Sequence, residues 1–336
     1  MNLRTPKSPR RRALWRKPIR DLNLRLKDSP VEPLIGRLER ELSRKLKRFR
    51  PAYYLTDEWG CPSGQPVIGV PFYLAHRELA RIEKETNDLE NTREIMMYLR
   101  HEAGHAFNYA YRLYQLPEWR DTFGPYRRRY SDEYRPIPFS RDYVRHLPGW
   151  YAQKHPDEDF AETFAVWLTP KSEWRLRYRG WPCRRKLLLV DRLARENARR
   201  EPLVKRGHPD ITTDDMRMTV GDYFNKTAAR TRAVLESAFA HHLEDIFLRS
   251  GSRRPGSRPA WKIVEGHGVA LTNVITTWTG VGRPVVREII HSILTTCRER
   301  GYRGVRGKEK EYLVHLTAYA TALAINYLTR GKYHKV

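Results

Sequence analysis

Residues 99–109 read LRHEAGHAFNY, in which His101 and His105 stand four positions apart and Glu102 follows the first histidine. Apolar residues recur at helical spacing around this H-E-x-x-H pattern, so the segment is predicted to be an α-helix. Side chains four apart on a helix lie on one face, one turn above each other. The two histidines can therefore bind one metal ion, with Glu102 beside them as a candidate base. Gly104 costs about 1 kcal/mol against alanine in a helix interior, which suggests that another element approaches closely there.

The composition indicates a globular protein with a large excess of positive charge. The 336 residues include 64 Lys and Arg against 39 Asp and Glu, a formal net charge of +25. This length allows two buried cores. No apolar run is long enough to span a membrane, and the basic N-terminus lacks the apolar segment of a secretory signal. The charge predicts attraction to nucleic acid or another polyanion.

Three cysteines, Cys61, Cys183 and Cys297, lie far apart and form no C-x-x-C pair. A disulfide framework or a zinc ribbon is therefore not expected. Because free thiols are typical of reducing compartments, we expect a cytoplasmic protein.

The residue pattern predicts a domain that holds the H-E-x-x-H helix, flanked by parts of different character. Residues 1–30 are basic and contain several prolines, which predicts a flexible arm. The H-E-x-x-H domain is expected over 31–200, followed by a linker over 201–222. Residues 223–336 are expected to form a helical C-terminal domain. Its helical segments are predicted at 223–249, 260–278, 283–299 and 308–329 and could form a small bundle.

Within 31–200, residues 31–50 have leucines at helical spacing and predict an amphipathic helix. Residues 52–56 and 66–74 read as strands joined by a Gly-Cys-Pro-Ser-Gly turn, which predicts a small hairpin or a sheet edge. Asn91 and Glu94 resemble a capping box that begins the H-E-x-x-H helix.

Residues 112–150 have no helical or strand periodicity and are too long for an ordinary connection. They are rich in arginine and tyrosine, including the run YRRRY at 126–130. We expect this loop to be a rim or lid over a cleft. Basic residues between aromatic ones also suit nucleic acid, so the loop and the basic arm are both candidate contacts for a polyanion.

A second predicted helix begins after His155 and reads PDEDFAETFAVWL over 156–168. Pro156 and the acidic residues suit its first turn. Glu158 and Glu162 are four apart and share a face. A catalytic zinc site usually has three protein ligands, and by spacing either glutamate could supply the third.

The H-E-x-x-H helix followed by an E-x-F-A-E helix resembles the gluzincin metallopeptidases. In particular it resembles the family named putative zinc-binding metallopeptidases, whose second helix carries an E-D-F-A-E-T-like run. The catalytic domain of anthrax lethal factor is a more distant likeness. The resemblance covers roughly residues 30–170. It implies an α+β, zincin-like domain with a small sheet and the H-E-x-x-H helix, here followed by the mainly helical C-terminal domain.

The resemblance implies that His101, His105 and Glu158 bind Zn²⁺. It also implies that Glu102 is the general base that takes a proton from a zinc-bound water, whose pKa the metal lowers towards 7. The implied activity is the hydrolysis of peptide bonds in a protein or peptide substrate.

Two more residues take roles from the resemblance. Glu162 would accept a hydrogen bond from a ligand histidine and fix its tautomer. Tyr151 stands seven positions before the ligand Glu158, where related enzymes have a tyrosine that stabilises the oxyanion. Tyr143, His146 and His155 are the alternatives for that role.

Two other functions are compatible with the sequence. One is a basic nucleic-acid-binding protein with a structural or vestigial zinc site, which the net charge favours. The other is a pseudoenzyme or toxin-like effector on the same scaffold. The sequence gives no indication of the oligomeric state.

Overall fold

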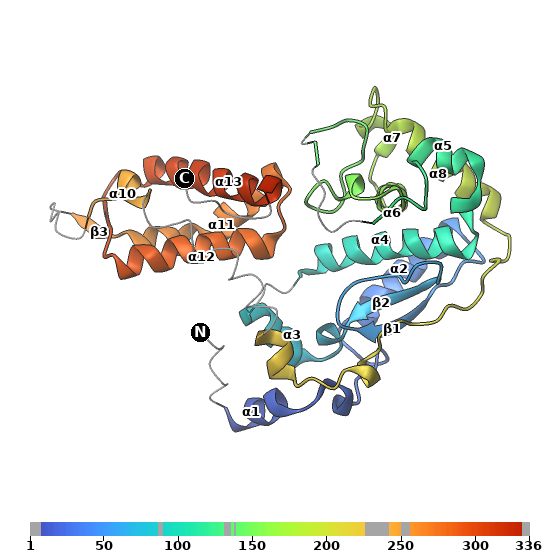
Figure 1. Ribbon diagram of the computed structural model, residues 1–336, viewed down its shortest axis with the longest axis horizontal. Helices are drawn as coiled ribbons and strands as arrows, with labels where there is room; N and C mark the ends of the chain where they lie inside the picture. The colour runs from blue at the N-terminus through green and yellow to red at the C-terminus, as the bar shows by residue number, and fades with distance from the viewer. Residues whose placement is uncertain are drawn as a thin grey trace. The chain divides into compact units, whose positions relative to one another are not determined.

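Two apolar cores organise the chain, which divides into the units Met1–Asn225 and Lys226–Val336 (Figure 1). The structure is a computed structural model, and it describes residues 8–86, 90–130, 136–137, 139–225, 242–249 and 256–330. The described part is mainly helical with small sheets, in agreement with the predicted α+β class. None of its helices is long and apolar enough to cross a membrane.

The part of the first unit that the structure describes contains helices and one pair of strands. In chain order they are α1 (Pro9–Arg16), η1 (Ile19–Leu22), α2 (Glu32–Lys45), β1 (Ala52–Thr56), β2 (Val67–Pro71), η2 (Phe72–Ala75), α3 (Arg77–Thr86), α4 (Thr92–Ala110), η3 (Leu113–Gln115), α5 (Pro117–Phe123), η4 (Tyr151–Gln153), α6 (Pro156–Leu168), α7 (Trp174–Arg177), α8 (Arg184–Asn197) and η5 (Thr213–Asp215). Helix α4 lies between the strand pair and α6 (Figure 1).

The segment predicted as a flexible arm is folded over residues 8–30. Trp15 and Ile19 are buried in the first core. The backbone of Ile19 donates a hydrogen bond to Met218 O at 3.0 Å, so this segment pairs with the one predicted as the linker 201–222. Gly221 makes room for the indole, since a Cβ there would lie 2.4 Å from Trp15 Nε1. The prediction was wrong because two apolar anchors outweigh the charge around them.

Helix α2 confirms the amphipathic helix predicted over 31–50. Leu38 and Leu42 are fully buried on its inner face. On the same helix the carboxylate of Glu41 accepts two hydrogen bonds from the Arg100 guanidinium, at 2.8 and 2.9 Å. Both side chains are buried, so this ion pair ties α2 to the turn of α4 next to His101.

Strands β1 and β2 pair in parallel, so the predicted hairpin is wrong. Their register runs from Ala52 opposite Val67 to Thr56 opposite Pro71. The intervening loop 57–66 returns beside β2, where Gly69 N donates to Gly60 O at 2.7 Å. Strand β2 therefore lies between β1 and this loop, and the loop becomes a wall of the functional site.

Helices α4 and α6 cross in close contact at Gly104. A Cβ on this glycine would lie 2.8 Å from the Cα of Ala161 and 2.9 Å from its carbonyl oxygen. The close approach expected from a glycine in the helix interior is thus present. The predicted capping box is also present, with Asn91 accepting from the Glu94 backbone and Glu94 from the Asn91 backbone.

Among its described residues, the second unit contains three long helices and one small sheet. Its elements are α10 (Leu243–Ile246), β3 (Ser257–Pro259), α11 (Ala260–Thr279), α12 (Arg283–Glu299), β4 (Arg303–Val305) and α13 (Glu309–Arg330). Strands β3 and β4 pair antiparallel. Three of the four predicted helical segments are found, and most of the fourth, 223–249, lies outside the described residues.

Candidate metal centre

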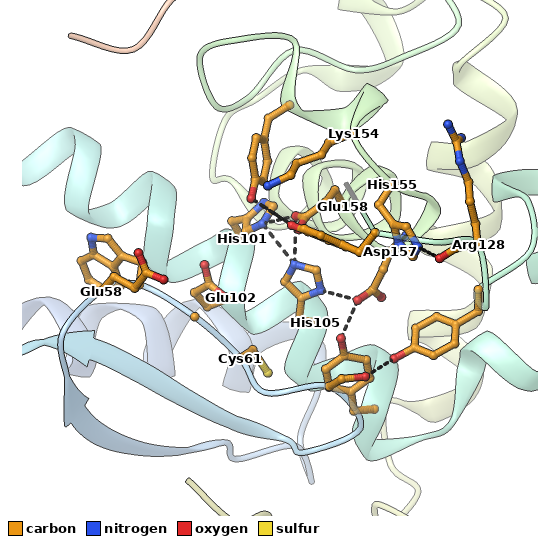
Figure 2. A pocket seen from close by; sticks show the side chains of 17 residues that line it. Glu58, Cys61, His101, Glu102, His105, Arg128, Lys154, His155, Asp157 and Glu158 are labelled. Atoms are coloured by element: carbon orange, nitrogen blue, oxygen red, sulfur yellow. Dashed lines mark hydrogen bonds and ion pairs between the residues drawn. The ribbon is translucent and has the colours of Figure 1, made fainter. Parts of the chain in front are cut away.

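The two helices that cross at Gly104 bring three metal-ligating side chains together. Helix α4 carries His101 and His105, and the first turn of α6 carries Glu158 (Figure 2). All three side chains are buried. The sequence predicted this set, and the structure places the three residues in one cluster that could hold a metal ion.

The donor atoms lie slightly closer together than the ligands of a tetrahedral zinc ion. His101 Nε2 lies 2.9 Å from Glu158 Oε2 and 3.1 Å from His105 Nε2, and His105 Nε2 lies 3.2 Å from the same Glu158 oxygen. Tetrahedral zinc with bonds of about 2.0–2.1 Å needs donors about 3.3 Å apart. The three side chains therefore fit the ion with only a small outward movement.

Each histidine has a carboxylate on its other ring nitrogen. His101 Nδ1 donates to Glu162 Oε1 at 2.9 Å, and His105 Nδ1 donates to Asp157 Oδ2 at 3.0 Å. These bonds leave Nε2 of each ring as the metal-facing atom. Glu162 is itself held by the Leu147 backbone N–H, which donates to Oε2 at 2.9 Å. Glu162 thus contacts the ring nitrogen of His101 that faces away from the cluster. Of the two glutamates that could supply the third ligand, Glu158 is the one in the cluster.

Asp157 is a site residue that sequence reasoning missed. Besides His105, it accepts hydrogen bonds from Asn108 Nδ2 at 2.8 Å and from the Tyr109 hydroxyl at 2.5 Å. The sequence did indicate that such a residue was needed. Each of the two ligand imidazoles requires a hydrogen-bond acceptor for its other ring nitrogen, and only one acceptor, Glu162, was predicted. Three acidic residues stand in the first turn of α6, and geometry decides which one serves His105.

The electrostatics of the cluster favour a bound cation. Burial lowers the pKa of the His101 imidazole, but hydrogen bonds to Glu158 and Glu162 outweigh it and raise the pKa to about 9. The carboxylates around His105 likewise raise its pKa despite burial. Burial raises the pKa of Glu158, but the two histidines outweigh this and hold it well below its usual range. The metal-free pocket therefore binds protons where a metal ion would sit.

Glu102 is buried on α4 beside the ligands and lines the same cavity. Burial raises the pKa of this carboxyl, and the two neighbouring histidines offset the effect only in part. A raised pKa brings a carboxylate closer to the value at which it can both take and return a proton near neutral pH.

Two tyrosine hydroxyls reach the outer oxygen of Glu158. Tyr151 OH lies 3.4 Å from Glu158 Oε1, at the position that the family resemblance implies. Tyr130, which was not predicted, donates to the same oxygen at 2.5 Å and lies 3.4 Å from the Tyr151 hydroxyl. Burial raises the pKa of Tyr151, so its hydroxyl stays protonated and able to donate.

The three alternatives to Tyr151 have other structural partners. His146 Nε2 donates to Met97 O at 3.0 Å. His155 caps α6 by accepting from the Asp157 backbone, and its other ring nitrogen donates to Arg128 O at 2.8 Å. The Lys186 ammonium lies 4.0 Å from the centre of the Tyr143 ring.

A cavity of about 660 Å³ opens onto the ligands and Glu102. One wall comes from the loop 57–66 beside β2 and includes Glu58, Trp59 and Cys61. The other includes Tyr130, from the loop after α5, and Tyr151. Tyr126, Arg128 and Tyr130 thus form part of the predicted rim, whereas the start of the loop predicted over 112–150 is helical in η3 and α5.

One region of the chain matches a known protein family. No curated protein and no solved structure matches the chain. Residues 73–172 match the model of one protein family, and this segment contains α4, α6 and the loop between them. The match confirms the resemblance predicted from the two helices. The family is the one described as "Putative zinc-binding metallo-peptidase", and the matched segment 73–172 contains His101, His105 and Glu158.

Proposed function

We infer that the protein is a zinc-dependent metallopeptidase of the gluzincin type, with a zincin-like catalytic domain in the first unit. The observation that carries this proposal is the trio His101, His105 and Glu158 beside Glu102 on an open cavity. Structural zinc sites are usually closed by four protein ligands, whereas catalytic sites have three and leave one position open. The described residues supply three donors and a cavity that can admit a substrate.

The residues around the cluster have complementary tasks in peptide hydrolysis. Zinc, when bound, would supply a Lewis acid and a water of lowered pKa. Glu102 would take a proton from the attacking water and pass it to the leaving amine. Asp157 and Glu162 would hold the two histidines in the ligating tautomer throughout.

The two tyrosine hydroxyls would donate hydrogen bonds to the carbonyl oxygen of the scissile bond. Tyr151 is the predicted donor, and Tyr130 lies within reach of the same region. A hydroxyl that donates to the developing oxyanion contributes about 2–4 kcal/mol to the transition state. In the structure both hydroxyls lie at Glu158 Oε1. Rotation of either hydroxyl away from this oxygen would let it donate to a substrate instead.

The state of the cysteines bears on the compartment in which the protein acts. All three cysteines are free thiols in the structure. This supports the expectation of a reducing compartment, and we propose that the protein acts in the cytoplasm.

Metal analysis combined with one isosteric variant tests the function. Purified protein should contain about one zinc per chain, and Glu102→Gln should keep the metal while losing at least about 100-fold in peptidase rate. Glu39→Gln, an exposed glutamate on α2, is the matched control and should keep both. Zinc-free protein from a zinc-replete preparation, or full activity in Glu102→Gln, would refute the proposal.

A further inference from the structure

The run YRRRY at 126–130, which we call the arginine strap, is fixed at one end of the cavity. Three hydrogen bonds anchor it to the loop 57–66 and to the start of α6. Tyr126 OH lies 2.8 Å from Ser63 Oγ, His155 Nε2 donates to Arg128 O at 2.8 Å, and Tyr130 OH donates to Glu158 Oε1 at 2.5 Å. The strap therefore connects the loop beside β2 with the first turn of α6. These anchors hold the backbone of the strap beside the cavity.

The three arginines of the arginine strap place positive charge on an exposed part of the first unit. Arg127, Arg128 and Arg129 are all exposed, and none of them forms an ion pair with a described residue. Arg128 lines the cavity. Three adjacent like charges repel one another, so a bound anion at this position would lower the electrostatic energy.

A further cation lies at the same cavity. Lys154 Nζ lies 4.5 Å from the centre of the Tyr130 ring and 5.3 Å from that of Tyr151. Both rings belong to the tyrosines that contact Glu158, so the ammonium lies beside the ligand cluster.

The opposite end of the cavity is acidic. Glu58 lies on the far side of Glu102 from Arg128 (Figure 2). Glu58 and Arg128 therefore place opposite charges on opposite sides of the ligand cluster. Such a field orients a charged ligand along the cleft and discriminates against the reversed direction.

We propose that the end of the cavity next to Arg128 is a subsite for a carboxylate of the substrate. The carboxylate is an acidic side chain or a free C-terminus on that side of the scissile bond. Arginine suits this role because its planar guanidinium can donate two parallel hydrogen bonds to one carboxylate. The proposal rests on the peptidase function, since it names the class of peptide that the site takes.

Peptide binding to the inactive Glu102→Gln variant tests the subsite without requiring turnover. The probes are fluorescein-labelled decapeptides of alanine, glycine and serine, with glutamate or glutamine at each position in turn and with a free or amidated C-terminus. Anisotropy should show tighter binding of one glutamate register, or of the free-acid peptides, by about fivefold over the neutral amides. The amidated glutamate series and the free-acid glutamine series separate the two sources of the carboxylate.

Variants of Arg128 in the same background assign the preference to the strap. Arg128→Gln should remove the fivefold preference and leave neutral peptides unchanged, and Arg128→Glu should favour the corresponding lysine peptide. Arg179→Gln, an exposed arginine on the first unit that does not line the cavity, changes the net charge equally and should keep the preference. Equal weakening of acidic and neutral peptides in Arg128→Gln would overturn the subsite, because that is the result of a purely structural role.

The outcomes separate this inference from the proposed function. Cleavage of peptides by the wild type without any carboxylate preference would overturn the subsite and leave the peptidase intact. A carboxylate preference in binding, with no cleavage by the wild type, would support the subsite and refute the peptidase. Arg128-dependent binding of a labelled single-stranded oligonucleotide, with no binding of any peptide, would overturn the proposal in favour of nucleic acid.

Discussion

Asp157→Asn should weaken zinc binding by about 10- to 100-fold, although Asp157 does not belong to the ligand cluster. The carboxylate accepts from His105 Nδ1, Asn108 Nδ2 and the Tyr109 hydroxyl, at 3.0, 2.8 and 2.5 Å. An asparagine keeps the shape but has a single acceptor oxygen and brings two N–H donors. One of the three buried donors must then face an N–H group.

The size of the effect follows from two contributions. A buried donor without an acceptor costs about 1–3 kcal/mol. The negative charge of Asp157 stabilises the protonated His105 ring in the metal-free state, and it stabilises the metal ion in the bound state. Removing this charge therefore destabilises both states, and only the difference changes the zinc affinity. The net loss is about 1.4–2.7 kcal/mol of zinc affinity, which corresponds to the 10- to 100-fold range.

Competition with a chromogenic chelator at constant pH measures this affinity directly. Asp245→Asn is the matched control, because this aspartate is exposed on α10 in the second unit. It should bind zinc like the wild type. Unchanged zinc affinity in Asp157→Asn, with the thermal midpoint also unchanged, would refute the claim that Asp157 orients His105.

Three further predictions follow from the same structure. Gly104→Ala should destabilise the protein by about 1–3 kcal/mol in urea unfolding, because the new Cβ meets the Ala161 backbone at 2.8 Å; wild-type stability would contradict the close crossing. Glu41→Ala should cost about 3–5 kcal/mol because it leaves the buried Arg100 charge unpaired, and a loss below 1 kcal/mol would argue against that pair. Hydrogen bonds to Glu158 and Glu162 raise the pKa of His101 to about 9 in the metal-free protein, so zinc must displace a proton from this ring below that pH. Zinc affinity should therefore rise between pH 6.5 and 9, by up to about tenfold per pH unit for each proton displaced. A flat pH profile in chelator competition would contradict this prediction.

The metal-binding part of the site was predictable because it depends on local periodicity. The spacing of His101 and His105 on a helix fixes their common face, and the residues of the second helix matched a family register that selects Glu158. No equally local rule separates Asp157 from the other acids of its turn. Its role depends on the angle at which α6 crosses α4, which is a tertiary property.

The remaining errors of the sequence reasoning also concern contacts between distant segments. Tyr130 lies in a loop without periodicity, so only the path of the folded chain brings its hydroxyl to Glu158. Strands were predicted over 52–56 and 66–74 and are found at Ala52–Thr56 and Val67–Pro71. The turn signal between them suggested a hairpin or a sheet edge, whereas the chain returns to pair in parallel. The N-terminal charge suggested disorder, while the burial of Trp15 depends on residues near 220.

The pairing of the first and last segments of the first unit has a consequence for folding during synthesis. Trp15 stacks on Phe224 with 6.2 Å between ring centres, a contact that spans nearly the whole length of the unit. The two helices of the metal centre leave the ribosome well before Phe224 does. The core beneath them cannot close until that residue has emerged, so a nascent chain that ends after α8 presents the zinc ligands on an incomplete domain. Contacts of such long range also slow folding.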